Sequence, residues 1–338
     1  MNVPQTSLES SHFPVMLNEV IKICSPEKGG NFVDCTFGGG GYSEELLKFP
    51  NTKVTALDRD RSVVEKANKI SKKYLDRFSF YNEKFSNLDK ILEGKDKVDT
   101  IIFDLGMSLF QIMDLNRGFS FKSNNKIDMN MGLSSTSAEE VLNNFDESSL
   151  KLIIKVLGEE KESAKIVNNI LKAREIKKIS MVPELVEIIK NSKRKNFSKR
   201  INICTKTFQA LRIFVNKETT ELIEGIIKAT KLIKIGGKII IISFHSIEDK
   251  IVKFYFKNYS ENNLNPSRYL PEEKVKKLIF FKEKKNNLIR ATEREIKENP
   301  PSRSAKLRFV TRNEKNFEDP KIFRNKFKKY LDLEGLNV

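Results

Sequence analysis

The sequence is poor in the residues that build disulfide frameworks and metal clusters. Its 338 residues include no tryptophan, three cysteines and two histidines. The cysteines (Cys24, Cys35 and Cys204) are widely spaced and odd in number, which excludes a disulfide framework and fits a reducing compartment. With only His12 and His245 beside them, no zinc cluster of cysteine and histidine can be assembled. We therefore expect a cytoplasmic protein with no metal site.

Long apolar runs are also missing. The run of four isoleucines at 239–242 is far too short to cross a bilayer. The first dozen residues are polar and carry no charge apart from Glu9, so they do not form a secretory signal. We expect no membrane partner.

Acidic residues are outnumbered, with 45 Asp and Glu against 62 Lys and Arg, which gives a formal net charge of +17. Such a surface favours a polyanionic partner, because lysine and arginine bind phosphates and release counterions. The alternative is that the lysines merely coat a soluble protein from an AT-rich genome. A nucleic-acid partner is the favoured interpretation, and the sequence leaves open whether the chain forms a homodimer.

The order of predicted elements indicates an α/β protein with a Rossmann-like sheet and an inserted all-helical domain. Strands and helices alternate up to about residue 105, and the pattern resumes with a helix near 216–233, a turn at 234–237 and a strand at 238–243. Predicted strands of the first block are at 31–36, 53–58, 77–81 and 98–104, and predicted insertion helices are at 137–144, 147–157, 159–174 and 182–191. Two last strands, around 278–281 and 305–311, suit an antiparallel pair.

These elements divide the chain into four parts. We expect the first part of the sheet domain at 1–106, a helical substrate-recognition insertion at 107–213, the second part of the sheet domain at 214–312, and a basic tail at 313–338. The tail is predicted to be solvated, with its basic stretch at 321–329 forming an amphipathic helix.

A glycine-rich turn follows the first predicted strand. Four glycines occupy 38–41, and Asp58 ends the next strand about 20 residues later, where an acid can hold a ribose hydroxyl. The dinucleotide fingerprint G-x-G-x-x-G fails in both registers, because its third glycine would fall on Ser43 or Glu44. S-adenosylmethionine, which has a ribose but no pyrophosphate, fits better than a dinucleotide. A purely structural turn is the alternative.

A second acid, Asp104, ends the fourth predicted strand, with Gln111 in the loop behind it. Ligands bind at such carboxyl edges, so Asp104 could bind an adenine amino group or steer the substrate, or it could simply cap the turn. In the same loop Arg117 could meet a phosphate. Phe119 and Phe121 could stack on a base or instead pack the insertion onto the sheet.

Later segments add basic and polar candidates. Residues 193–200 carry five bases and precede the 206–216 segment, which indicates a phosphate-binding edge or a solvated face. His245 follows the 239–243 strand. Because an attacking amine loses its proton after the new bond forms, we interpret His245 as a positioning residue or a structural histidine rather than a strong base.

Taken in order, these motifs resemble the bacterial 16S ribosomal RNA cytosine-N4 methyltransferase family from residue 12 to about 312. The resemblance rests on HFPVML at 12–17, TFG at 36–38, LDRD at 57–60, DLG at 104–106, RGFSF at 117–121, GEE at 158–160, TFQALR at 207–212, SFHS at 243–246 and RSA at 303–305. It implies a Rossmann-like domain with a helical insertion that uses S-adenosylmethionine to methylate N4 of a cytidine in the decoding region of the small ribosomal subunit.

Carried over by motif, the resemblance implies the cofactor contacts Gly40, Gly41, Tyr42, Asp58, Phe85, Asp104 and Gln111. Candidates for holding the cytidine are Arg117, Arg212, His245 and Arg303. The chain departs from the family pattern at Tyr42, Phe110 and Lys206, where histidine, proline and arginine are usual. Two other functions stay open: a non-catalytic RNA-binding assembly factor, and a nucleotide-dependent oxidoreductase.

Overall fold

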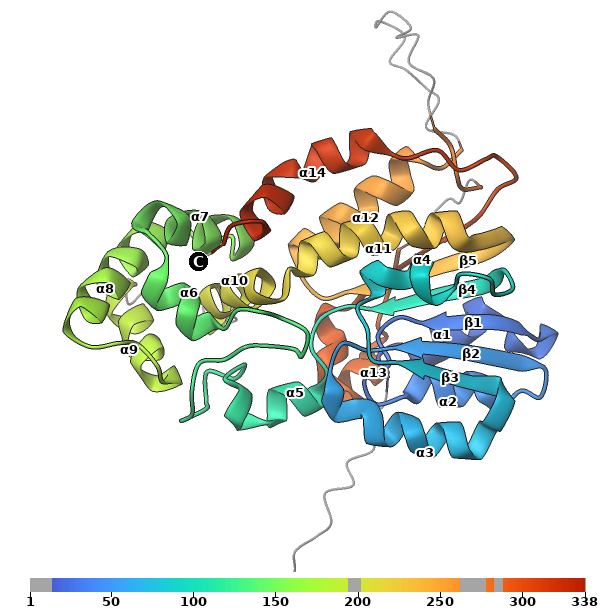
Figure 1. Ribbon diagram of the computed structural model, residues 1–338, viewed down its shortest axis with the longest axis horizontal. Helices are drawn as coiled ribbons and strands as arrows, with labels where there is room; N and C mark the ends of the chain where they lie inside the picture. Colours follow the sequence, from blue (N-terminus) through green and yellow to red (C-terminus); the bar gives the residue numbers. More distant parts are fainter. Residues whose placement is uncertain (1–13, 194–201, 262–277, 283–287, 338) are drawn as a thin grey trace, which may run out of the picture.

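The computed structural model describes residues 14–193, 202–261, 278–282 and 288–337. Its centre is a seven-stranded sheet of order β3-β2-β1-β4-β5-β7-β6 (Figure 1). The first five strands in that order are parallel, and β7 is antiparallel to both β5 and β6. The strands are β1 (Gly30–Asp34), β2 (Thr52–Leu57), β3 (Phe78–Tyr81), β4 (Val98–Asp104), β5 (Ile233–Ser243), β6 (Leu288–Arg290) and β7 (Lys306–Thr311). The predicted fold class is confirmed.

The isoleucine run explains how the sheet is buried on both faces. Ile239 and Ile241 join one hydrophobic cluster, and Ile240 and Ile242 join a second one, because alternate side chains of a strand point to opposite faces. The second cluster lies under α1 (Leu17–Cys24), α2 (Gly41–Leu47) and α3 (Val64–Tyr74). The first lies under α4 (Leu88–Ile91), α11 (Glu218–Leu232) and α12 (Ser246–Asn258) and continues into the insertion.

Two strand predictions need correction. The turn expected at 234–237 is instead an irregularity inside β5, where the pairing jumps from Ile233 opposite Val98 to Lys238 opposite Thr100 and Gly236 takes a φ of 80°. The segment 278–281 is not the strand expected beside β7, because the strands that pair with β7 are β5 and β6. It does run antiparallel at the end of β7, where Phe281 forms a bridge with Arg312 and the Lys282 amide donates to the Thr311 carbonyl at 2.9 Å. Within that segment Phe281 makes isolated bridges only, and the Phe280 and Phe281 rings are fully buried among other aromatic side chains, so burial explains the apolar run.

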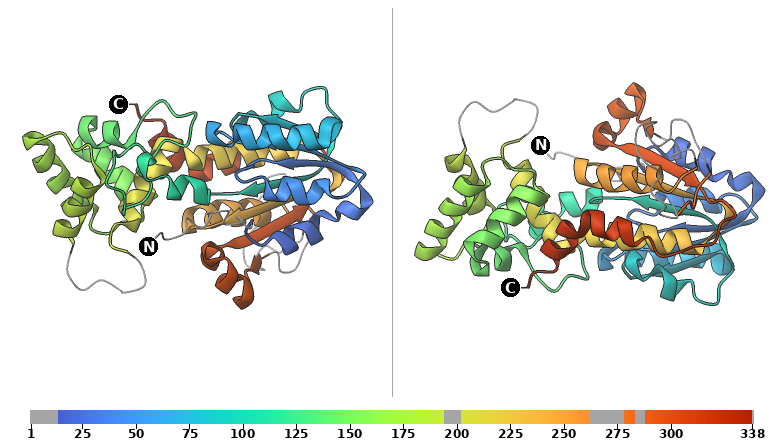
Figure 2. Two further views of the ribbon diagram at one scale, coloured as in Figure 1. Left: turned by 90° about the horizontal axis from the view of Figure 1, so that it is seen from below. Right: turned by 90° about the horizontal axis from the view of Figure 1, so that it is seen from above.

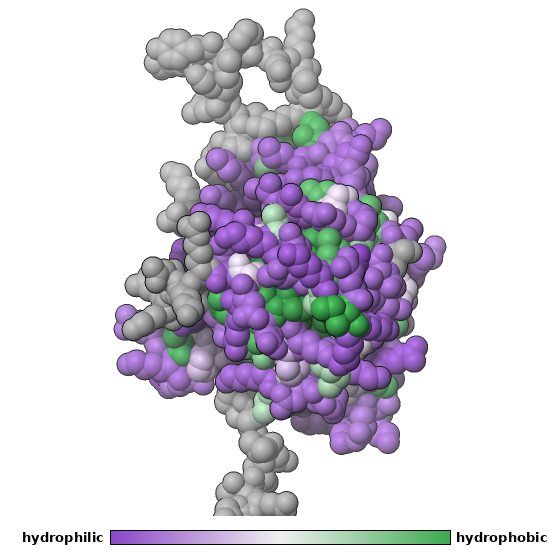
Figure 3. All heavy atoms as spheres, turned by 90° about the vertical axis from the view of Figure 1, so that its left-hand side faces the viewer, coloured by the Kyte–Doolittle hydropathy of each residue, from purple (hydrophilic) through white to green (hydrophobic). Residues whose placement is uncertain are grey.

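Between β4 and β5 the chain forms a helical layer that extends from one end of the sheet (Figures 1 and 2). Its helices are α5 (Leu109–Met113), α6 (Ala138–Asn144), α7 (Glu147–Leu157), α8 (Ser163–Ile176), α9 (Val182–Ser192) and α10 (Thr205–Asn216). Helix α10 was not predicted, and it continues past the expected boundary at 213. It packs on α7 so closely that a Cβ on Gly158 would overlap the Lys206 carbonyl. The outer end of this layer is largely hydrophilic (Figure 3).

The C-terminal segment is not solvated as predicted. Helix α14 (Lys321–Glu334) packs along α11 and α7, and its apolar stripe of Phe323, Phe327, Tyr330 and Leu333 is buried. The amphipathic character was predicted correctly, and the stripe is what drives the packing. Glu334 accepts hydrogen bonds from the first backbone amides of α11, at Thr219 and Thr220.

A short helix, α13 (Glu293–Glu298), completes the described elements. Among the described residues, no helix combines the length and the apolar character that crossing a membrane requires. His12 and Phe13 of the first motif and the basic residues 194–200 lie outside the described residues.

Candidate cofactor site

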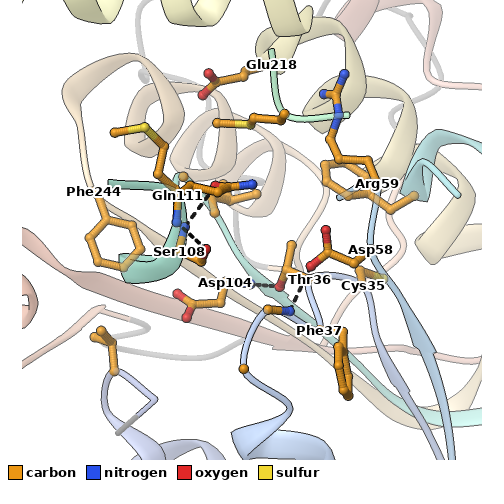
Figure 4. A pocket seen from close by; sticks show the side chains of 18 of the residues that line it. Cys35, Thr36, Phe37, Asp58, Arg59, Asp104, Ser108, Gln111, Glu218 and Phe244 are labelled. Atoms are coloured by element: carbon orange, nitrogen blue, oxygen red, sulfur yellow. Dashed lines mark hydrogen bonds between the residues drawn. The ribbon is translucent and has the colours of Figure 1, made fainter. Parts of the chain in front are cut away.

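A cavity of about 270 Å³ lies at the carboxyl ends of the central strands, between the glycine-rich turn, the loop after β4 and the start of α11 (Figure 4). Seven of the predicted site residues line it: Gly41, Tyr42, Asp58, Phe85, Asp104, Gln111 and Arg212. Four do not: Gly40, Arg117, His245 and Arg303. Arg303 is exposed in the turn Pro300–Ser304.

The glycine-rich turn shapes one wall of the cavity. Gly38 and Gly40 take φ values of 48° and 76°, a region that favours glycine. A Cβ on Gly40 would overlap Phe37 and Ile70, so Gly40 faces the core and sets the turn. A Cβ on Gly41 would overlap the Pro14 ring, which also lines the cavity. The turn therefore holds Pro14 close to the start of α2.

Asp58 stands at the end of β2 beside this turn. Its Oδ2 accepts a hydrogen bond from the Gly38 amide at 2.7 Å, and its Oδ1 accepts one from the Asp60 amide at 2.8 Å. Burial raises the pKa of Asp58 to about 6, although these two amide donors act against the increase. Each oxygen keeps a second lone pair, which a ligand hydroxyl can use.

Asp104 ends β4 and faces Tyr42. The Tyr42 hydroxyl donates to the Val15 carbonyl at 2.5 Å and lies 3.3 Å from Asp104 Oδ2. Within the described part of the chain, Asp104 Oδ1 is buried and has no hydrogen-bond partner. Burial and the neighbouring Asp34 carboxylate raise the pKa of Asp104 well above its usual range. A buried acceptor without a partner at a cavity wall indicates a site for a ligand donor.

Gln111 takes part in a network that anchors the loop after β4. Its Oε1 accepts from the Ser108 amide at 3.1 Å, and its Nε2 donates to Asp60 Oδ2 at 2.7 Å (Figure 4 shows the Ser108 contact). Arg117 donates to the same Asp60 oxygen at 2.5 Å and to the Asn130 carbonyl at 2.7 Å. Burial acts to raise the pKa of Asp60, but the hydrogen bonds from Arg117 and Gln111 outweigh it and lower that pKa. Arg117 thus holds the loop and does not face the cavity.

The aromatic residues of this region pack the protein. Phe85 lines the cavity and meets Phe103 edge to face, with the ring centroids 5.3 Å apart. A Cβ on Gly225 of α11 would lie 2.6 Å from the Phe85 ring, so only glycine allows this approach. Phe119 is buried and Phe121 packs against Phe208, which favours the packing interpretation of both residues over base stacking.

The far wall carries a charged cluster from α10, α11 and α12. Arg212 donates through Nε and one terminal nitrogen to both oxygens of Glu218, each at 2.8 Å. Burial opposes the charge on Arg212, but Glu218 and Glu248 outweigh it and raise the pKa of Arg212. Glu248 Oε2 accepts from the Phe244 amide at 2.8 Å, while its Oε1 lies 3.1 Å from His245 Nε2. The His245 side chain is 11% exposed and packs behind this wall.

Ligand atoms of Glu218, His245 and Glu248 lie within 4.8 Å of one another, a spacing that a cation could use. Counting cysteines and histidines misses such a group, because two of its members are glutamates. The guanidinium of Arg212 already places a positive charge beside this group, because it forms an ion pair with Glu218.

The charges around the cavity favour a cationic ligand. Six carboxylates line it (Asp58, Glu83, Asp104, Glu218, Glu221 and Glu248), against the three cations Arg59, Lys84 and Arg212. A dinucleotide would bring a doubly negative pyrophosphate into this acidic surrounding, which costs energy in a partly buried site. A sulfonium cofactor brings a positive charge and fits.

Sequence reasoning missed the acids of the far wall, and it also missed Arg59 and the residue that supports it, Asn216. Arg59 lines the cavity and donates to the Asn216 carbonyl at 2.7 Å and to Ser134 Oγ at 2.9 Å. Asn216 is fully buried at the end of α10. Its side-chain amide holds the loop at 129–134, because Nδ2 donates to the Met129 carbonyl and Oδ1 accepts from the Met131 amide. Arg59 belongs to the LDRD motif, but its hydrogen-bond partners lie far away in the sequence, so no local pattern predicted its role. Lys206, one of the three positions at which the chain departs from the family pattern, donates through Nζ to the Glu159 carbonyl at 2.8 Å.

Comparison with known proteins identifies the family. The model of the MraW methylase family matches residues 9–313. "Ribosomal RNA small subunit methyltransferase H" of Rickettsia bellii (strain RML369-C) is 39% identical over 308 residues, covering 89% of this chain and 98% of that protein. The protein of the same name from Ehrlichia ruminantium (strain Welgevonden) is 41% identical over 309 residues, covering 88% and 98%.

Among solved structures, a putative rRNA methylase from Clostridium thermocellum is 12% identical, covering 90% of this chain and 99% of that one, with a TM-score of 0.40. That score is too low to support any argument. The family match and the two relatives cover nearly the whole chain, so the assignment as an S-adenosylmethionine-dependent methyltransferase rests on them. The chain belongs to the MraW methylase family.

Proposed function

We propose that this methyltransferase acts on N4 of a cytidine in the decoding region of 16S ribosomal RNA within the small ribosomal subunit. The relatives are named as small-subunit ribosomal RNA methyltransferases, and the net charge of +17 suits an RNA partner. The observation that carries the proposal is the buried, partnerless Asp104 Oδ1 at the cavity wall, because an exocyclic amine needs an acceptor that holds it in line.

The cavity residues divide between the two substrates. Asp58 would hold the cofactor ribose, Phe85 would lie beside its adenine, and the backbone at Gly41 and Tyr42 would enclose its amino-acid end. Gln111 would act indirectly, because both ends of its amide already bond Ser108 and Asp60. When bound, S-adenosylmethionine supplies an electrophilic methyl group on a positively charged sulfur, which the acidic lining stabilises.

Asp104 would act on the cytidine. Its Oδ1 would accept an N4–H hydrogen bond and so direct the nitrogen lone pair toward the methyl group. The Asp104 carboxylate would then take the proton that the amine releases after the carbon–nitrogen bond forms. Arg212 would act as a positioning residue, since Glu218 fixes its guanidinium at the cavity wall.

The test is methyl transfer to undermethylated small ribosomal subunits. The purified protein and methyl-labelled S-adenosylmethionine are incubated with the subunits, and the labelled nucleoside is identified by mass spectrometry after digestion. We expect N4-methylcytidine, with a turnover loss of about 10²–10⁴-fold in Asp104→Asn and none in Asp332→Asn, at an exposed position on α14.

Each other result has a clear meaning. Label on another atom or on another RNA would refute the assigned substrate. RNA binding without cofactor binding would favour the assembly-factor alternative. Full activity of Asp104→Asn would remove Asp104 from the mechanism while leaving the substrate assignment intact.

A further inference from the structure

A second hollow, of about 650 Å³, runs along the exposed face of α12. We call it the α12 groove. It is lined by Lys250, Lys253, Phe254, Lys257 and Asn258 of the helix and by Lys306 of β7. The lysines at 250, 253 and 257 follow the helical repeat, so they share one face over about 10 Å of helix.

The charge of the α12 groove is almost entirely positive. Asp249, its one acidic lining residue, accepts from Lys306 Nζ and Arg308 Nε, each at 2.8 Å. Two cations therefore neutralise this carboxylate. Lys250 and Lys253 are exposed, and neither has a carboxylate partner anywhere in the described ranges. Surface lysines without acids around them bind phosphates as point charges.

A second element extends this positive surface. Lys326 of α14 is exposed and its Nζ lies 5.8 Å from the centre of the Phe254 ring, which lines the α12 groove. Phe254 itself stacks on Phe323 and meets Phe327 edge to face, so the packing of α14 fixes the position of Lys326 beside the groove. Both helices lie on the same face of the sheet (Figure 1).

The α12 groove starts where the cofactor cavity ends. Phe244 and Glu248 line the cavity, whereas Ser246 and Asp249, on the same first turn of α12, line the groove. Ser246 Oγ also donates to the carboxylate of Glu159, which lies two residues beyond the end of α7, and this contact joins the start of the groove to the helical insertion. A strand that places one nucleotide in the cavity can therefore continue along α12.

We propose that the α12 groove binds the sugar-phosphate backbone of the ribosomal RNA next to the target nucleotide, through Lys250, Lys253 and Lys326. This inference rests on the proposed function, because it takes the RNA substrate from it. Counterion release gives the size of the effect. Each phosphate contact on single-stranded RNA contributes a slope of about −0.7 in log K against log salt concentration. Relative to 1 M salt, where this contribution is zero, one contact therefore raises the affinity at 0.15 M salt roughly fourfold.

The experiment compares two triple variants of the full-length protein. Lys250→Gln/Lys253→Gln/Lys326→Gln removes the groove charge, and Lys66→Gln/Lys72→Gln/Lys90→Gln removes the same charge from exposed positions on α3 and α4. The Kd for undermethylated small ribosomal subunits is measured from 0.05 to about 0.3 M KCl, and S-adenosylmethionine affinity is measured separately by calorimetry.

The groove variant should bind the subunits about 50-fold more weakly at 0.15 M salt, with a salt slope smaller by about 2, and should keep its cofactor affinity. The control variant should stay close to wild type. Equal losses in both variants would mean that only overall charge matters, and an unchanged groove variant would mean that the RNA runs elsewhere; either result overturns the inference.

Failure of the proposed function is visible separately. Wild-type protein that binds the subunits but transfers no methyl group refutes the proposed function, while the binding comparison still decides the inference. Wild-type protein that does not bind the subunits at all refutes both. Groove-dependent binding of an acidic peptide or of anionic vesicles in preference to RNA would also overturn the inference.

Discussion

Replacing Asn216 by alanine should destabilise the protein more than most single changes. Asn216 is fully buried, and its amide makes four hydrogen bonds: Nδ2 donates to the carbonyls of Met129 (2.7 Å) and Arg212 (2.8 Å), and Oδ1 accepts from the Met131 amide (2.8 Å) and Ser134 Oγ (3.1 Å). Alanine removes all four.

Two of the four partners determine the loss. The Arg212 carbonyl also belongs to the ladder of α10, and Ser134 Oγ also accepts from Arg59, so both retain a partner. The Met129 carbonyl and the Met131 amide lose the partner that the structure shows for them, on residues that are 0% and 5% exposed. At 1–3 kcal/mol for each unsatisfied buried group, the change costs about 4 kcal/mol.

The expected shift in melting temperature follows from the chain length. An unfolding entropy of about 2.1 cal/mol/K per residue gives about 0.7 kcal/mol/K for 338 residues, so about 4 kcal/mol lowers Tm by about 6 °C. Differential scanning calorimetry measures this directly. Ser134→Ala is the matched control, because it removes one partner of Asn216 and one of Arg59 while both keep others, so it should lower Tm by only about 2 °C.

Cofactor binding should weaken together with stability. The Asn216 carbonyl accepts from Arg59, which follows Asp58 in the chain and lines the cavity. Loosening this end of α10 should therefore raise the Kd for S-adenosylmethionine, as titration calorimetry would show. A Tm for Asn216→Ala within about 1 °C of wild type would show that the loop at 129–134 has other partners and would refute the reasoning.

Three further changes test other parts of the site. Gly41→Ala should lower both Tm and cofactor affinity, because its Cβ would overlap the Pro14 ring at the cavity wall; unchanged affinity would mean that Pro14 does not shape the site. Burial raises the pKa of Asp34 from 3.8 to about 6, so the folded protein holds a proton there that the unfolded chain releases, and wild type should lose up to about 3 kcal/mol of stability as pH rises from about 4 to about 6. The Tm of Asp34→Asn minus that of wild type should rise across this window, and a flat difference would contradict the raised pKa. Arg117→Lys should cost about 1–3 kcal/mol, because lysine cannot reach Asp60 and the Asn130 carbonyl with a planar fork; a Tm equal to that of Arg290→Lys, a change at an exposed position, would argue against this anchor.

The parts of the fold that local sequence determines were predictable. The parallel strands, the glycine-rich turn and the acids at the ends of β2 and β4 follow from apolar runs, glycine and chain direction, and the structure brings Asp58 and Asp104 to one cavity. The pairing of β6 with β7 was not predictable, because 278–281 is the more apolar segment. That segment meets only the end of β7, and Phe281 packs against aromatic side chains of α12.

Long-range polar pairs were beyond the sequence for a different reason. Asp60 bonds residues 51 and 57 positions away, and Arg59 reaches Asn216 across 157 positions, so no local pattern records these contacts. They change the role of predicted residues: Arg117, expected at a phosphate, holds the loop after β4. The burial of α14 was visible as an apolar stripe, but a basic composition made solvation look more favourable.

The distribution of charge separates the two binding tasks of the enzyme. The protein carries +17 overall, yet six carboxylates and three cations face its cofactor cavity, so a cation is attracted inward while polyanions are attracted to the outer lysines. Exposed charges are screened within about 8 Å at physiological salt, whereas groups inside a cavity are screened much less. Cofactor affinity should therefore change little with salt while RNA affinity falls steeply. The acids of the cavity also repel a backbone phosphate. This repulsion favours entry of the target base with its phosphates left outside, as the proposed role of the α12 groove requires.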